Sequence, residues 1–207
     1  MPCFTAFAAA VAERYRRLAS LWVLVPALVA MAAFLVLFQV TGRMVADGGA
    51  TGLELQRAFT PERFGAVVDA WGDGAEAFKT NLIMLDFAFP LIYAAGLGSL
   101  VALAGGPGPA RAALLLFSLP WAAAGLDWVE NLLHLWLLAD VHTAADAAAA
   151  AFSAPVVLAA SLAAMLKFAL LLVAAAGAVV LAARRRCWWG AAAGAALFAS
   201  FTSVLWA

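Results

Sequence analysis

The stretch GLDWVENLLHLW, residues 125–136, lies inside a long apolar segment and decides the fold. Its polar members are Asp127, Glu130, Asn131 and His134. At 3.6 residues per turn, these side chains fall within an arc of about 100° on one face of a helix. Trp128, Leu132 and Trp136 lie near the opposite face, which can meet lipid or apolar neighbours. The pattern predicts a membrane helix whose polar stripe points into a bundle.

The rest of the chain is too apolar for a soluble domain. Of its 207 residues, 67% are hydrophobic and 12% are charged, whereas soluble domains average roughly half apolar and about a quarter charged. The formal net charge is zero, so the chain has no global basic field that would attract nucleic acid. The composition indicates a polytopic membrane protein whose immediate partners are membrane lipids.

Five segments reach the roughly 20 residues that a bilayer core requires. They are residues 18–40, 81–104, 112–138, 156–182 and 188–206. The fifth is the least apolar, although Gly190 and Gly194 form a GxxxG pattern that permits close helix contact; four spans are the alternative. We therefore predict an all-α transmembrane helical bundle of about five spans, forming a single membrane domain over residues 1–207.

The loop 41–80 carries signals for amphipathic helices. Thr60 is a candidate N-cap and Pro61 suits the first helical position. The apolar residues that follow at helical spacing are Phe64, Val67, Val68 and Trp71. Gly72 ends this helix, and Asp73 begins another that leads into the second span. Such a helix either caps the outer end of the bundle or lies in the lipid headgroup layer.

Two other spans offer partners for the polar stripe. Asp86, Pro90 and Tyr93 share a face of the second span at i, i+4 and i+7, and Lys167 lies on the fourth. At about 1.5 Å per residue, Lys167 and Asp127 each lie roughly 16 Å from the outer end of their spans. We therefore expect these two to pair. The predicted polar cluster comprises Asp86, Tyr93, Asp127, Glu130, Asn131, His134 and Lys167, and it extends from the bilayer centre toward the outer side.

Three acids and one lysine leave this cluster with an excess of about two negative charges, which is costly inside a membrane. Protonation of a carboxyl, a bound cation, or water entering from outside would each relieve that cost. The chain lacks HExxH, a nucleophile elbow, a P-loop and a GxGxxG after a strand. We therefore expect no metal and no cofactor, and we assign no role to His142.

Three stretches together resemble a group of small bacterial polytopic integral membrane proteins of unassigned function. They are FTPERFGAVVDAWG at 59–72, LDFAFPLIY at 85–93 and GLDWVEN at 125–131, with Lys167 following. The resemblance covers most of residues 20–180. It implies a shared membrane bundle with an outer helical insert, located in the bacterial inner membrane. It brings no known activity, so no catalytic residue can be transferred.

Three functions fit these observations. In the first, the polar cluster binds a small or amphipathic ligand, or a proton, from the outer side. In the second, the protein is an intramembrane enzyme that modifies a lipid, with Asp127, Glu130 or Asp86 as acid or base. In the third, the cluster only fixes the helix packing of an accessory or scaffold protein. The chain has no internal repeat of the kind that marks many secondary transporters. Sequence leaves the ligand, the catalytic residues and the oligomeric state open.

The distribution of basic residues predicts the orientation. Seven arginines flank one set of span ends: Arg14, Arg16, Arg17, Arg111, Arg184, Arg185 and Arg186. By the positive-inside rule these ends, and the N-terminus, are cytoplasmic. A topology reporter fused at Pro107 should therefore read as cytoplasmic and one fused after Ala207 as extracytoplasmic. A cytoplasmic reading after Ala207 would remove the fifth span.

Overall fold

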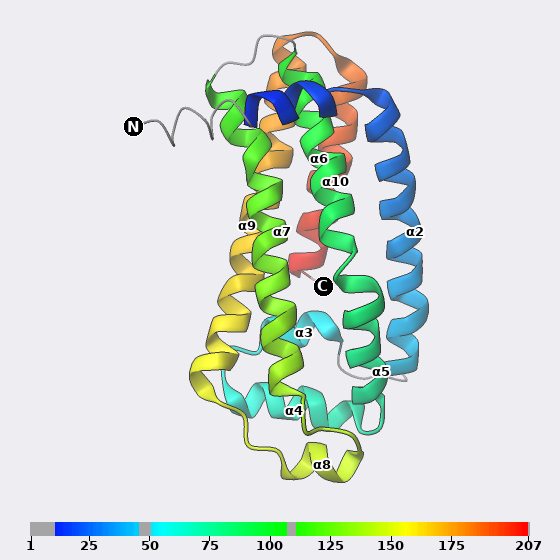
Figure 1. Cartoon of the computed structure of the whole chain (residues 1–207), viewed down its shortest axis with the longest axis vertical. Helices are drawn as coiled ribbons and strands as arrows, with labels where there is room; N and C mark the ends of the chain where they lie inside the picture. The colour runs from blue at the N-terminus through cyan, green and yellow to red at the C-terminus, as the bar shows by residue number, and fades with distance from the viewer. Residues whose placement is uncertain (1–10, 46–50, 107–110, 207) are drawn as a thin grey trace. The chain divides into compact units, whose positions relative to one another are not determined.

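The computed structural model describes residues 11–45, 51–106 and 111–206, and within these ranges every regular element is a helix (Figure 1). Residues 11–18 form a short helix before the long ones. The α-helices that follow are α2 (Leu21–Val45), α3 (Gly52–Gln56), α4 (Pro61–Trp71), α5 (Gly74–Asn81), α6 (Phe89–Gly105), α7 (Arg111–Leu137), α8 (Ala144–Ala149), α9 (Ala154–Arg184) and α10 (Trp188–Trp206). A π-helical segment, η1 (Leu82–Asp86), lies between α5 and α6. The prediction of an all-α helical bundle is confirmed.

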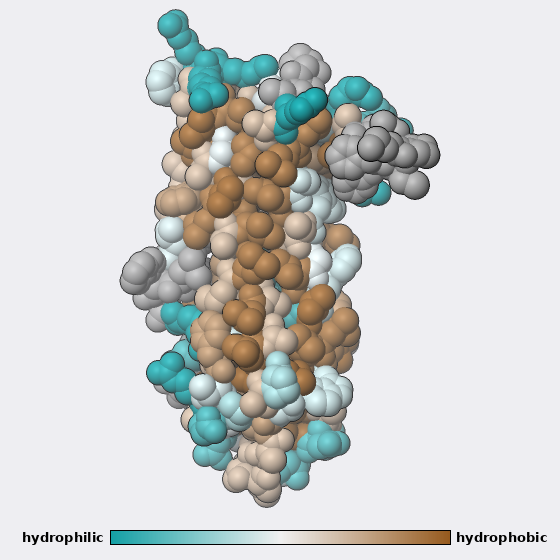
Figure 2. Space-filling model, turned by 90° about the vertical axis from the view of Figure 1, so that its left-hand side faces the viewer, coloured by the Kyte–Doolittle hydropathy of each residue, from teal (hydrophilic) through white to brown (hydrophobic). Residues whose placement is uncertain are grey.

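Four helical segments of the described chain are long and apolar enough to cross a membrane. They are Leu21–Gly42, Gly74–Gly105, Arg111–Leu137 and Ala154–Arg184, which match the first four predicted spans. Figure 2 shows hydrophobic side chains exposed along the helices on one face of the molecule. The helix α10 coincides with the predicted fifth span but is not among these four, so a fifth crossing stays a prediction. Residues 107–110, between the second and third predicted spans, lie outside the described residues.

The chain divides into two compact units. The first contains Met1–Met31, Leu91–Ala124 and Phe168–Ala207, and the second contains Ala32–Pro90 and Gly125–Lys167. The helices α2, α6, α7 and α9 each contribute residues to both. Of the predicted polar cluster, only Tyr93 belongs to the first unit.

The first unit is held by close helix contacts near small residues. The buried Tyr15 donates its hydroxyl to the carbonyl oxygen of Ala102 at 3.0 Å. A Cβ built on Gly194 of α10 would lie only 2.9 Å from the side chain of Val179 on α9. The GxxxG pattern therefore does permit the close helix contact that was predicted.

In the second unit, α4 forms as its sequence predicts. Thr60 Oγ1 accepts a hydrogen bond from the backbone N–H of Arg63 at 3.4 Å, and Pro61 occupies the first turn. Gly72 ends the helix with a φ of 53°, in the region that favours glycine. The apolar face is buried in a core made of Val45, Leu55, Ala58, Phe64, Val68, Trp71, Ala75, Leu137, Leu138, Val141, Ala147 and Val157. The apolar face of α4 thus packs on protein, which supports the capping alternative over a helix lying in headgroups.

The loop between α7 and α9 contains α8, which the sequence analysis did not predict. Its capping box pairs Thr143 with Asp146. Hydrogen bonds from the Thr143 hydroxyl and from the backbone N–H groups of His142 and Thr143 hold the pKa of Asp146 below its ordinary value of 3.8. Because that pKa is lowered, the carboxylate stabilises the loop above its unfolded pKa, and the contribution is lost as pH falls through the lowered value.

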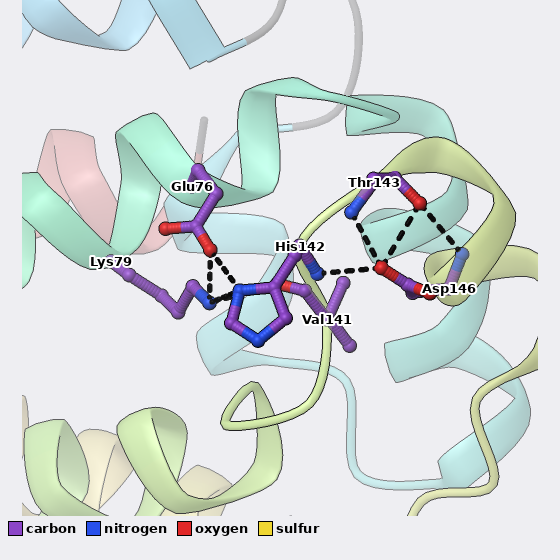
Figure 3. A network of polar contacts seen from close by, with 6 residues as sticks. All are labelled: Glu76, Lys79, Val141, His142, Thr143 and Asp146. Carbon is purple, nitrogen blue, oxygen red and sulfur yellow. Dashed lines mark hydrogen bonds and ion pairs between the residues drawn. The ribbon is translucent and has the colours of Figure 1, made fainter.

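A polar network joins this loop to α5 (Figure 3). Lys79 Nζ lies 2.7 Å from Glu76 Oε1 and donates to the carbonyl oxygen of Val141 at 2.8 Å. His142 Nδ1 contacts the same Glu76 oxygen. Lys79 is buried, which is uncommon for a lysine. The network fastens the α7–α8 connection to the start of the second span.

We call α3, α4, α5 and α8 the cap of the second unit. Its fit to α2 depends on Gly74, because a Cβ there would collide with the backbone carbonyl of Val45. Gly74→Ala should therefore lower the free energy of unfolding by about 1–3 kcal/mol, as overpacking usually does. Gly125→Ala is the matched control, because nothing lies within 4 Å of its added Cβ; it should be neutral or stabilising by about 0.5–1 kcal/mol. Thermal unfolding in detergent measures both, and equal effects would contradict the assigned contact.

Candidate functional site

The polar stripe of α7 faces the protein interior, as predicted. The exposed fractions of Asp127, Glu130, Asn131 and His134 are 2%, 0%, 0% and 1%. On the other side of the helix, Trp128, Leu132 and Trp136 are 37%, 57% and 62% exposed. The contrast follows from the helical period, because residues at i, i+3, i+4 and i+7 share one face.

Lys167 of α9 bridges two carboxylates of this stripe. Its Nζ donates a hydrogen bond to Asp127 Oδ1 at 2.6 Å, so the predicted contact is confirmed. The same Nζ lies 2.6 Å from Glu130 Oε2, a second ion pair that was not predicted. The signal for it was present in the sequence, since Asp127 and Glu130 are three residues apart on one helix face. The ammonium meets Glu130 at ion-pair distance but outside hydrogen-bond geometry.

The second span does not continue as a regular α-helix through Asp86. Pro90 has no N–H and its ring crowds the carbonyl four residues earlier, which is that of Asp86. The chain responds with η1, in which Phe87 N–H bonds the carbonyl of Leu82, and with a turn before α6. The prediction that Asp86, Pro90 and Tyr93 share one α-helical face is therefore wrong. Tyr93 is buried in α6, within the first unit.

Two side chains of α7 satisfy the carbonyls freed by this break. Asn131 Nδ2 donates to the backbone oxygen of Asp86 at 3.2 Å, and Trp128 Nε1 donates to that of Phe87 at 3.0 Å. Asp86 also lies within electrostatic range of Asp127, Glu130 and Lys167. We call Asp86, Asp127, Glu130 and Lys167 the carboxylate cluster. It contains three acids and one base, as the sequence predicted.

Four buried polar atoms of the polar stripe have no hydrogen-bond partner among the residues that the structure describes. They are Glu130 Oε1 and Oε2, Asn131 Oδ1 and His134 Nε2, and of these Oε2 lies at ion-pair distance from Lys167. His134 Nδ1 lies 3.9 Å from Glu130 Oε1, which exceeds hydrogen-bond distance. The amide oxygen of Asn131 can only accept a hydrogen bond, and the same holds for Glu130 Oε1 when the carboxylate is ionised. The site therefore lacks donors, and a proton or a donor-bearing ligand would complete it.

Phe64 of the cap covers the His134 end of the stripe. The two rings are 6.0 Å apart between centroids, and Phe152 packs edge-on against Phe64 at 4.8 Å. Phe64 is 1% exposed. The sequence predicted Phe64 as part of an apolar face but not as a neighbour of His134, because no local pattern links residues 70 positions apart. Phe64 is therefore the aromatic side chain of the cap that lies against His134.

Comparison with protein-family models, with curated proteins and with solved structures finds no match to this chain.

The bridging role of Lys167 makes a quantitative prediction. Lys167→Met leaves two buried carboxylates without their cation and should cost about 3–5 kcal/mol, as breaking a buried pair does. Asp127→Asn should cost less, because Glu130 still faces the ammonium. A double-mutant cycle on thermal unfolding in detergent should show coupling of about 0.5–3 kcal/mol between positions 127 and 167.

The control for this cycle is Arg63→Met, which removes an exposed cation from the same unit and should change stability by no more than about 0.5 kcal/mol. Additive losses at positions 127 and 167 would rule out the direct pair, and a larger loss for Asp127→Asn than for Lys167→Met would rule out the bridge.

Proposed function

We propose that this chain is a multi-pass membrane protein that binds a small hydrogen-bond-donating ligand, or takes up a proton, at the carboxylate cluster. The observation that carries the proposal is that this site lacks both positive charge and hydrogen-bond donors. Two buried carboxyls, Asp127 and Glu130, contact one ammonium, and a third, the partly exposed Asp86, lies within electrostatic range of it. In addition, Glu130 Oε1 and Asn131 Oδ1 accept no hydrogen bond from the described residues. A donor with a positive charge, or a proton, corrects both shortages.

Energetics support a binding site over a cluster that only fixes packing. A buried polar network that serves packing alone is stabilising when all its members are satisfied, and a partly satisfied network costs free energy. Each buried polar group left without a partner costs roughly 1–3 kcal/mol. Sites that bind ligands routinely carry such costs, because the ligand supplies the missing partner.

A scaffold role is the second candidate, and one observation favours it. Lys167 contacts two acids from a different helix, an arrangement that also fixes the register of α9 against α7. An intramembrane lipid-modifying enzyme has less support. The residues Asp127, Glu130 and Lys167 are at most 4% exposed, and a lipid substrate would have to displace the covering side chains to reach them.

The proposed location is the bacterial inner membrane, with the arginine-rich ends in the cytoplasm. In the first unit, Arg14, Arg16, Arg17, Arg111, Arg184, Arg185 and Arg186 are all exposed. Exposed arginines next to membrane spans are the pattern that retains a segment on the cytoplasmic side. In this orientation the loop 41–80, and with it α3 and α4, faces the outside.

Two measurements test the proposal, one of bound protons and one of a bound small molecule. Potentiometric titration of the purified protein in detergent should show a component of proton uptake that is lost in the double variant Asp86→Asn, Glu130→Gln. The matched control is Glu62→Gln, Asp69→Asn, which removes two exposed acids from α4 and should keep that uptake. If the occupant is a ligand and not a proton, native mass spectrometry of the protein purified from its own membrane should reveal a bound small molecule that is absent from Glu130→Gln. The absence of both signals would leave the scaffold role.

A further inference from the structure

We propose that the occupant of the carboxylate cluster is a proton, that Glu130 carries it, and that His134 delivers it to Glu130 and removes it. This inference rests on the proposed function, since it names the ligand and the residues of that same site. Four observations carry it: the burial of the site, the uneven pairing of its acids, the position of His134, and the cover over it.

Burial selects the smallest occupant. Glu130 and Asn131 are 0% exposed, His134 is 1% exposed, and Lys167 is 4% exposed. Protein interiors are close-packed, so a molecular ligand could enter only by displacing side chains. A proton needs no volume. It also removes one of the two excess negative charges, which in a dry interior are far more costly than in water.

The pairing of the acids selects Glu130. Asp127 accepts a hydrogen bond from Lys167, so its oxygen already has a charged donor. Glu130 meets the same ammonium outside hydrogen-bond geometry, and its Oε1 has no donor within the described part of the chain. A hydrogen on Oε1 turns this acceptor into a donor aimed at its neighbours. Lys167 then remains paired with Asp127, so the cation is not left alone.

The position of His134 supplies a path. It lies one helical turn after Glu130, and its Nδ1 is 3.9 Å from Glu130 Oε1. A shortening of about 1 Å brings these atoms to hydrogen-bond distance. The other ring nitrogen, Nε2, has no partner among the described residues. Imidazole is the side chain that can accept a proton at one nitrogen while it releases one from the other.

The proposed transfer moves one proton from water through His134 to Glu130. A proton from water binds His134 Nε2, and the hydrogen on Nδ1 moves to Glu130 Oε1. The imidazole is neutral before and after and has exchanged tautomers, while Glu130 changes from carboxylate to carboxylic acid. Release runs in reverse. The charged and titratable groups that face Glu130 are Asp127 and His134 on its own helix, Lys167 on α9 and Asp86 on η1. The cap contributes Phe64, which does not titrate.

The cover explains how such a proton is kept from free exchange. Phe64 lies against the His134 ring and is itself held by Phe152. In this proposal water reaches Nε2 past Phe64, because Glu130 and His134 are buried while Asp86 is only partly exposed. The rate of exchange should therefore depend on His134 and on the cap, while the equilibrium depends on Glu130.

Infrared difference spectroscopy in detergent, during a step between acidic and alkaline pH, tests the assignment. The unmodified protein should show a carboxylic-acid C=O band that Glu130→Gln abolishes and that Glu62→Gln, at an exposed acid of α4, keeps. His134→Gln should keep the band but slow its appearance by about a hundredfold, within the range that positioned proton carriers contribute. His142→Gln, at the other histidine, is the control and should leave the rate unchanged.

A second measurement needs no variant. A hydrophobic carbodiimide adds to a protonated carboxyl and rearranges to an N-acylurea with no group lost, so peptide mass spectrometry should place the whole reagent mass on Glu130. Labelling or an infrared band at Asp127 or Asp86 instead would overturn the inference but leave the proposed function standing. If the carboxylic-acid band appears at an unchanged rate in His134→Gln, His134 does not carry the proton. Failure of all cluster-dependent proton uptake would overturn this inference, and the proposed function would then depend on a small molecule that Glu130→Gln loses; the absence of that molecule as well would overturn both.

Discussion

The ammonium of Lys167 between Asp127 and Glu130 is the interaction on which the second unit depends. One cation from α9 compensates two acids that a single helix presents three residues apart. Without it, the polar stripe of α7 could not stay buried, because uncompensated charge is too costly away from water. Burial of the acids would then no longer fix which face of α7 is exposed. The orientation of α7, with its tryptophans exposed and its acids inside, thus follows from one contact between helices.

A second constraint comes from the backbone at Pro90. Because proline cannot donate, the carbonyl of Asp86 needs another partner, and Asn131 provides it from α7. This places an acid-bearing break in the second span beside the acids of the third. The amide nitrogen of Asn131 is occupied by this hydrogen bond, and the amide oxygen lies beside the cluster without a donor among the described residues. The break explains why an amide occurs in the stripe, and π-helical segments of this kind recur at functional sites.

Local periodicity predicted much of this arrangement. The helical spacing of Asp127 to His134 gave the buried face, and that of Phe64 to Trp71 gave the apolar face of α4. Counting residues from the span ends gave the Lys167–Asp127 contact. Periodicity could not predict η1, since a proline shows that a helix must adjust but not how. Nor could it predict that Phe64 covers His134, or that Lys79 and His142 meet at Glu76, because these contacts join segments about 60 to 70 residues apart.

We expect the cap and the carboxylate cluster to be energetically linked through Phe64. The same side chain is part of the core that holds the cap together and lies against the ring of His134. A change that loosens the cap should therefore admit water to the site, and water weakens the electrostatic interactions there because it raises the local dielectric constant. Conversely, excess charge in the cluster favours hydration and so opposes closure of the cap. A neutralised Glu130 removes part of that opposition. Closure of the cap and occupancy of the cluster should accordingly favour each other, as linkage between two sites on one equilibrium requires.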